Sequence, residues 1–408
     1  MSQIRRRHVF FIEGYEPQGA DGFHRMFRRE WNRFRENWSV RSNLSDCNNE
    51  SGEIANWTVE TAGPNWQVST TYEFLRLEHL IRSNLAQPFW LQLVRTARWM
   101  FDDIASGALA RVFRASWRMG VLLIYSQVIL VAWIALALAG GWYTADFISP
   151  PTSPGVVKFA LTAAFAAGWF ALFYPVAACM FVNQLNNCWP YLREFARGTP
   201  TGFDRLLDIL AGRLVAVARA NEADEILVVG HSAGAMLALA TMVKALERDP
   251  DVGRRGPRVS VMTAGSIMPA LAMHPAAEPL RRIVAAIAAE RSVLWTDCQC
   301  REDFMNFWEF DPVSGIGANP GERRCNPQIW QVPFRKMIAP EIFAKVRFNY
   351  WRMHYQYIMS NDRHAPYDYY MFLCGPAPFA DWAALDGSVC ARFDAEGNYR
   401  VPEMKAAE

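Results

Sequence analysis

Two long stretches without a charged side chain lie in the first half of the chain and limit what it can fold into. The first covers residues 121–140 and the second covers residues 159–184. A helix rises about 1.5 Å per residue, so about 20 apolar residues reach across the roughly 30 Å hydrocarbon core of a bilayer. Residues 141–158 between them contain Pro and Ser and predict a loop. We therefore expect a transmembrane hairpin of two helices, with a buried hairpin in a soluble protein as the alternative.

Arginines flank this hairpin on both outer sides. Arg111, Arg114 and Arg118 precede it, and Arg193 and Arg197 follow it. Because basic residues stay on the cytoplasmic side of a membrane, both termini and the domain they form are expected in the cytoplasm. The loop then lies outside, and we expect the membrane to be a bacterial inner membrane.

The same region contains signals for lipid contact and for self-association. Ala160, Ala164 and Gly168 recur every fourth position, a spacing that lets two helix backbones approach closely. A second copy of the chain is therefore a candidate partner, beside the lipid bilayer itself. Upstream, residues 90–118 mix Trp and Phe with Arg, which is typical of a helix at the lipid headgroups; an ordinary surface helix is the alternative.

Charge and cysteine usage exclude several function classes. The chain has 42 basic and 40 acidic residues, a formal net charge of +2, so no broad field attracts nucleic acid. Its eight cysteines are irregularly spaced and imply no disulfide framework. Cys298 and Cys300 lack a second ligand pair at zinc spacing, so two thiols on a strand are favoured. Without a phosphate-binding Gly-rich loop or an H-E-x-x-H motif, we expect neither a metal nor an organic cofactor.

Strand and helix patterns alternate outside the hairpin, which predicts an α/β domain with a largely parallel sheet. The hairpin interrupts this domain, so residues 1–110 and 186–408 would complete one sheet and residues 111–185 would form the membrane part. The expected strands begin in residues 8–14 and continue at Trp57–Glu60, Gln67–Tyr72, Glu225–Val229, Arg258–Ala264 and Ser292–Cys298, with helices at Phe203–Ala220, Ala235–Glu247 and Pro279–Glu290.

One of these strands leads directly into a motif that carries chemistry. Glu225–Val229 is followed by Gly-His-Ser-Ala-Gly at residues 230–234 and then by an Ala- and Leu-rich helix. This is the G-x-S-x-G pattern in a strand–turn–helix context, where a sharp turn exposes the Ser232 hydroxyl. The N–H of Ala233, at the start of the helix, is placed to donate to an oxyanion. His231 is expected to point away from Ser232 and to fill space.

The elbow and the strand–helix order around it resemble the α/β-hydrolase superfamily, in particular lipases and esterases, although the membrane hairpin departs from their soluble architecture. The resemblance implies that an acid and then a histidine follow the nucleophile in the chain. It also implies a second oxyanion donor in the loop after an early strand. Gly14 and Tyr15 occupy such a loop, with a plain turn as the alternative.

Three carboxylates are candidates for the acid. Asp303 lies a few residues beyond the strand at Ser292–Cys298 and precedes apolar residues that would anchor it. Asp311, in an Asp-Pro-Val sequence, is the runner-up, and Asp297 is the third candidate. At least two of the three must be ordinary surface or turn carboxylates.

The general base has two candidates, because only His354 and His364 follow these carboxylates. His354 begins an apolar, aromatic helical stretch, whereas His364 lies in a polar turn where an exposed histidine needs no special role. An unperturbed imidazole titrates near pH 6.5 and can accept the serine proton and return it. His354 is therefore preferred.

These residues predict a membrane-anchored serine hydrolase that cleaves an ester or thioester with an apolar acyl chain. An amidase or peptidase would use the same residues. A different class, a catalytically silent membrane scaffold with the hydrolase fold that binds a protein or lipid, is the alternative. Contact among Asp303, His354 and Ser232 favours the enzyme, and its absence favours the scaffold.

Overall fold

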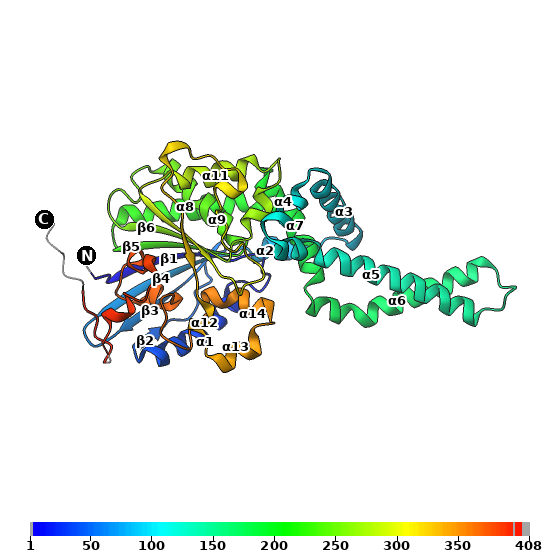
Figure 1. Cartoon of the computed structure of the whole chain (residues 1–408), viewed down its shortest axis with the longest axis horizontal. Coiled ribbons are helices and arrows are strands. Elements are labelled where there is room, and N and C mark those ends of the chain that lie inside the picture. Colours follow the sequence, from blue (N-terminus) through cyan, green and yellow to red (C-terminus); the bar gives the residue numbers. More distant parts are fainter. Residues whose placement is uncertain (1–2, 395, 402–408) are drawn as a thin grey trace.

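A computed structural model describes residues 3–394 and 396–401 of the chain (Figure 1). At its centre is an eight-stranded sheet in the order β2-β3-β4-β1-β5-β6-β7-β8. The strands are β1 (Arg6–Ile12), β2 (Arg41–Leu44), β3 (Ile54–Ala62), β4 (Gln67–Leu75), β5 (Glu225–His231), β6 (Arg258–Ala264), β7 (Val293–Gln299) and β8 (Gln328–Gln331).

The sheet is mixed, so the expectation of a largely parallel sheet is confirmed only in part. From β4 through β1 to β8 the neighbouring strands run parallel. In contrast, β3 runs antiparallel to both β2 and β4. The physical reason is the connection at residues 63–66, which is long enough for a hairpin but too short for a parallel crossover.

Strand β1 lies in the middle of the sheet and joins the N-terminal part of the domain to the part that follows the hairpin. It pairs with β5 in a register that sets Ile12 beside Gly230. Because the two strands run parallel, the loop after β1 and the turn after β5 leave the sheet at the same edge. This edge therefore holds both the Gly14–Tyr15 loop and Ser232.

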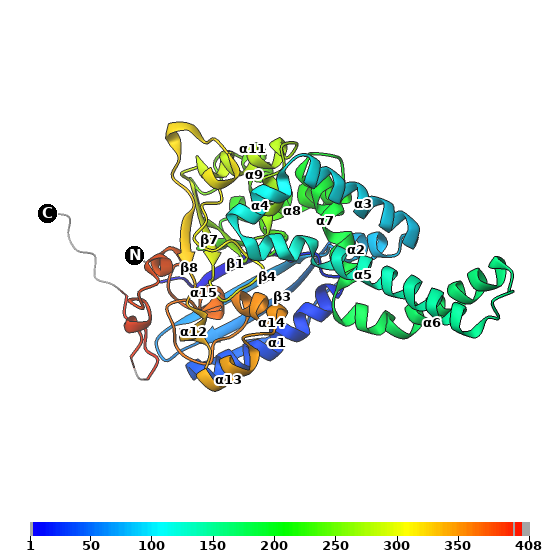
Figure 2. The same cartoon turned by 45° about the vertical axis from the view of Figure 1, so that its right-hand side comes forward.

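Helices cover both faces of the sheet, and each face has its own apolar core. Helices α8, α9 and α11 lie on one face, whereas α1 and α12 to α15 lie on the other (Figures 1 and 2). The domain helices are α1 (Gly19–Trp38), α2 (Glu78–Leu85), α3 (Phe89–Ala105), α4 (Ala108–Ala115), α7 (Val182–Ala196), α8 (Gly202–Ala220), α9 (Gly234–Arg248), α10 (Met268–Ala272), α11 (Glu278–Ala288), α12 (Phe334–Met337), α13 (Pro340–Val346), α14 (Tyr350–Tyr355) and α15 (Tyr369–Cys374), with short 3-10 helices at Ser314–Ile316, Gly321–Arg323, Gln356–Ile358, Phe379–Ala384 and Cys390–Arg392.

Two helices project from this domain as a hairpin: α5 (Trp117–Ile148) and α6 (Gly155–Cys179) (Figures 1 and 2). Both are long and apolar enough to cross a membrane. Their side chains are mostly uncovered: in the most apolar window of α6 none is buried, and in that of α5 only 28% are buried. Water-soluble monomers rarely expose so continuous an apolar surface.

The hairpin differs in its boundaries from the sequence prediction. Helix α5 continues to Ile148 instead of ending near residue 140, because the first helix-breaking pair is Pro150-Pro151. At its other end, Met119, Leu122 and Leu123 are buried against the domain. The uncovered part of α5 is therefore shifted toward the turn at residues 149–154.

The second uncharged stretch also divides into two parts. Helix α6 ends at Cys179, and Phe181 has a left-handed φ of 55°, after which α7 begins at Val182. Helix α7 packs on the domain, so Asn183 and Gln184 belong to it and not to a membrane span. A left-handed residue interrupts a helix even inside an apolar run.

Candidate active site

Ser232 lies in a strained turn between β5 and α9. Its φ is 57°, a left-handed conformation that is uncommon for a residue with a side chain. The N–H of Ser232 donates to Ala264 O of the neighbouring strand β6 at 2.9 Å. A Cβ at position 234 would lie 2.1 Å from Ile12 O, so Gly234 is required where α9 crosses β1. The strand–turn–helix geometry of the G-x-S-x-G pattern is therefore present, and the nucleophilic role of Ser232 stays a prediction.

Of the candidate acids and histidines, the structure brings Asp303 and His354 together. His354 Nδ1 lies 2.9 Å from Asp303 Oδ2, and both side chains are almost completely buried. The other oxygen, Asp303 Oδ1, accepts from the Met305 N–H at 2.8 Å. With a carboxylate at Nδ1, this nitrogen carries the proton and Nε2 presents its lone pair. The pair has the arrangement that a general base requires.

The second ring nitrogen of His354, Nε2, is buried and has no hydrogen-bond partner among the described residues. The ring lies beside the elbow, because a Cβ at Gly265 would be 3.0 Å from His354 Cε1, and Gly265 follows the residue that binds the Ser232 N–H. No hydrogen bond joins Ser232 to His354 in the described part of the chain. Catalytic hydrogen bonds are often long in ligand-free enzymes and shorten when substrate binds.

The loop after β1 lies directly against Ser232. A Cβ at Gly14 would lie 3.0 Å from Ser232 Cβ, 3.3 Å from its Oγ and 3.4 Å from the Ala233 nitrogen. Among the described residues, neither the N–H of Tyr15 nor that of Ala233 has a hydrogen-bond acceptor. Two such amides beside a serine hydroxyl are what an oxyanion needs, and this role remains a prediction for Gly14, Tyr15 and Ala233.

Tyr15 is held in place from both sides. Its hydroxyl donates to Asn84 Oδ1 at 2.6 Å, and its carbonyl accepts from Gln184 Nε2 at 2.8 Å. Burial raises the pKa of the Tyr15 hydroxyl, which keeps it a neutral donor. Because Gln184 belongs to α7, the candidate oxyanion loop is tied to the helix that follows the hairpin.

A small cavity of about 50 Å³ opens at Ser232 and has mainly apolar walls. Met305 lines it from the loop that carries Asp303, and Trp351 lines it from helix α14, which carries His354. Leu185 lines it from α7, and Leu122 lines it from the first turns of α5. The base of the hairpin is therefore part of the wall around Ser232.

The alternative acids and the alternative histidine lie elsewhere. Asp311 accepts from Ser314 Oγ and from Arg324, each at 2.7 Å. His364 stacks on the Trp38 ring at 3.8 Å and hydrogen-bonds Asn37 O.

Asp297 is the third candidate acid, and it lies inside the sheet. It accepts from Thr263 Oγ1 and Gln299 Nε2. Burial raises the Asp297 pKa to about 6. Neither this carboxylate nor Asp311 contacts a histidine among the described residues.

His231 has a positioning contact that sequence reasoning missed. Its Nε2 lies 3.0 Å from the backbone carbonyl of His354. Burial, followed by the nearby His354, lowers the His231 pKa to about 3, so the ring is neutral and donates to this carbonyl. His231 therefore fixes the backbone of α14 against the elbow. The only local signal was a histidine next to the nucleophile, and its partner is more than a hundred residues away.

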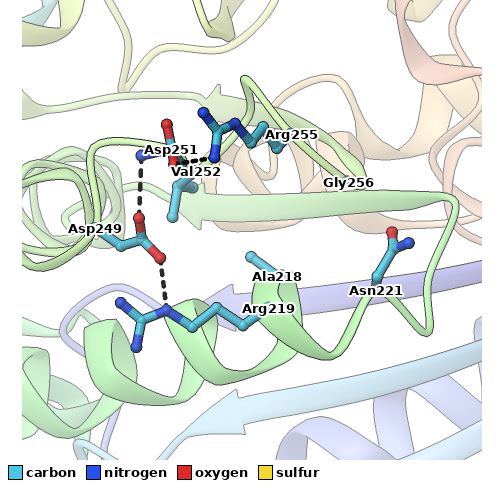
Figure 3. Close-up of a pocket in the computed structure, with 8 residues that line it drawn as sticks. All are labelled: Ala218, Arg219, Asn221, Asp249, Asp251, Val252, Arg255 and Gly256. Carbon is cyan, nitrogen blue, oxygen red and sulfur yellow. Dashed lines mark hydrogen bonds and ion pairs between the residues drawn. The ribbon is translucent and has the colours of Figure 1, made fainter.

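A second hollow lies at the opposite edge of the sheet, beside the end of α8 and the start of β6 (Figure 3). Its charged groups already pair with each other: Arg219 with Asp249 at 2.6 Å, and Arg255 with Asp251 at 3.1 Å. No group of three or more metal-ligating side chains occurs in residues 3–394 and 396–401. The strained serine and the buried acid–histidine pair make the Ser232 edge the better candidate.

Comparisons with known proteins find no match for this chain. No family model, no curated protein and no solved structure matches the chain.

Proposed function

We propose that this protein is a membrane-anchored serine hydrolase of the α/β-hydrolase type, which cleaves an acyl ester or thioester. The observation that carries the proposal is the buried Asp303–His354 hydrogen bond beside the left-handed Ser232. The three residues come from the turn after β5, the loop after β7 and helix α14. A strained residue beside a hydrogen-bonded acid–histidine pair marks a candidate catalytic site.

The reaction follows from the roles of these groups. His354 Nε2 takes the proton of Ser232 Oγ while this oxygen bonds to the acyl carbon. The carbonyl oxygen becomes an anion and accepts from the N–H groups of Ala233 and Tyr15. The tetrahedral intermediate then expels an alcohol or thiol, which receives the proton from His354. Water repeats the same steps on the acyl-enzyme and releases the acid.

The apolar walls of the cavity support a substrate with an apolar acyl chain. Leu122 supplies part of this wall from α5, the first helix of the hairpin. An acyl chain that follows α5 out of the bilayer would therefore come close to Ser232. The proposal includes two membrane spans, with both termini and the catalytic domain in the cytoplasm of a bacterium. No metal or organic cofactor takes part in the proposed steps.

Labelling of the detergent-solubilised protein with a fluorophosphonate probe tests the proposal. This probe bonds only to an activated serine, so the wild type is expected to label and Ser232→Ala to lose all labelling. Ser314→Ala is the matched control, because its hydroxyl binds Asp311 away from the site. Labelling that persists in Ser232→Ala would overturn the assignment of the nucleophile.

Among the described residues, the absence of a Ser232–His354 hydrogen bond and the small cavity at Ser232 favour a second candidate, the catalytically silent scaffold. Folded wild-type protein that neither labels nor hydrolyses nitrophenyl esters of short or long acyl chains would support the scaffold. Hydrolysis of nitroanilides in preference to nitrophenyl esters would instead identify an amidase.

A further inference from the structure

A larger cavity lies at the base of the hairpin, apart from the one at Ser232. Its volume is about 430 Å³. The first turn of α7 separates the two: Val182, Asn183 and Asn186 face the larger cavity, whereas Leu185 lines the cavity at Ser232. The larger cavity therefore has its own walls, and no residue assigned to the proposed reaction lines it.

One wall consists of the hairpin itself. Leu130 and Trp133 contribute from α5, and Trp169, Phe170 and Phe173 contribute from α6. The two helices that carry these residues project from the domain (Figure 2). If α5 and α6 cross a bilayer, acyl chains are the molecules that surround this wall.

The opposite wall is polar but carries no charge. It contains Gln92 from α3 and Asn183 from α7. The Gln92 amide is already bonded, since it accepts from Asn187 Nδ2 at 2.7 Å and donates to the carbonyls of Leu85 and Gln87, whereas the side-chain N–H groups of Asn183 have no acceptor among the described residues. None of the described residues that line the cavity is ionisable. Amides pair well with ester carbonyls and hydroxyls, whereas a phosphate needs Arg or Lys.

A buried donor adds to this polar character. The indole N–H of Trp169 is shielded from solvent and has no acceptor among the described residues. A buried N–H without a partner is costly, since it gives up its hydrogen bond to water. An ester or hydroxyl oxygen in the cavity would satisfy it.

An exposed apolar face on α3 indicates that the bilayer surface lies close to this helix. Trp90, Val94, Phe101 and Ile104 are all exposed, and Phe101 exposes 74% of its surface. They lie at spacings that place them on one side of the helix. Phe89 is exposed at the start of α3 and also lines the cavity, so the cavity and this face are continuous.

We propose that this cavity binds one neutral lipid of the diacylglycerol type. One acyl chain lies along the wall that α5 and α6 form, and the ester or hydroxyl oxygens face the side-chain amide of Asn183 and the indole of Trp169. The site requires the hairpin to lie in a membrane but does not require Ser232 to be catalytic.

Photocrosslinking tests this site in the full-length protein reconstituted into phosphatidylcholine vesicles. One set of vesicles contains a diacylglycerol with a photoactivatable acyl chain, and a matched set contains phosphatidylglycerol with the same chain. All proteins carry Ser232→Ala, so that hydrolysis of the probe cannot affect the result. We expect the neutral probe to label peptides that contain Trp133 or residues 169–186, and the anionic probe to label them about tenfold less.

Two substitutions to tryptophan at neighbouring positions of α5 test where the lipid binds. Leu130→Trp fills the cavity and is expected to lower this labelling about tenfold. Val131→Trp points to the lipid side of the same helix, where Val131 is 66% exposed, and is expected to leave labelling within about twofold of the parent. Equal labelling in the two variants, equal labelling by the two lipids, or labelling confined to the outer half of the hairpin would each overturn the proposal.

Discussion

Asp303 and Asp311 lie in the same connection between β7 and β8, yet their surroundings differ in every respect that matters for catalysis. Asp303 is fully buried and faces a histidine whose second nitrogen has no partner in residues 3–394 and 396–401. The Asp311 side chain is 30% exposed and faces Arg324. The histidines differ in the same way, because His354 is buried beside the elbow whereas His364 is exposed and stacks on the buried ring of Trp38.

This difference teaches that residue type does not define a catalytic group. A carboxylate beside an arginine stays ionised and fixes a loop, and it has no proton to position. A carboxylate beside a buried histidine selects the tautomer and the orientation of that ring. The comparison therefore yields matched pairs of variants with the same chemistry and opposite expected effects.

The largest effect is expected from the histidines. His354→Ala removes the proposed base and should lower esterase kcat/KM by roughly 10⁴- to 10⁶-fold, as the loss of a triad member does. His364→Ala should change kcat/KM less than about twofold, since it has no contact with the site. Rates with a nitrophenyl ester measure both. The reverse order would move the base to His364.

The acids come next in size. Asp303→Asn should lower kcat by about 10⁴-fold, because an amide favours the wrong tautomer of His354. Asp311→Asn is expected to leave kcat nearly unchanged and to cost about 1 kcal/mol of stability through the lost pair with Arg324. Steady-state kinetics and thermal unfolding separate the two effects. A kcat for Asp303→Asn near that of the wild type would remove it from the mechanism.

A smaller effect is expected in the oxyanion loop. Gly14→Ala places a methyl group 3.0 Å from Ser232 Cβ, which displaces the loop. This substitution should lower kcat by about 10- to 100-fold. Gly52→Ala is the control, since nothing lies within 4 Å of its Cβ position. If both variants keep full activity, the Gly14–Tyr15 loop does not hold the oxyanion.

The smallest effect is a pH-dependent loss of folding stability caused by His231. Its ring faces the rings of His354 and Tyr355. Burial, then the nearby His354, lowers its pKa to about 3, below the unfolded value near 6.5. Its neutral form therefore stabilises the fold above pH 6.5, and this contribution is lost as the pH falls toward 3. Between pH 7 and pH 5 the wild type should lose about 2 kcal/mol relative to His231→Gln. Denaturant unfolding in detergent measures this difference, and parallel pH profiles would contradict it.

Much of the architecture could be predicted from local patterns. Two uncharged stretches predict the hairpin, and the structure contains two helices long and apolar enough to cross a membrane. A buried strand before Gly230 and an Ala-rich helix after Gly234 predict the strained turn at Ser232. Periodicity and turn chemistry act over a few residues, so one sequence is enough to show them.

Only the tertiary structure decided which distant residues meet. The pairing of Asp303 with His354, the antiparallel direction of β3 and the contact of His231 with the His354 carbonyl all depend on packing between separate segments. The break between α6 and α7 at Phe181 likewise depends on where the domain surface begins and on a single left-handed residue. Local sequence determines what each segment can form, whereas the choice among equivalent carboxylates and histidines is made by the burial and contacts that the whole fold imposes.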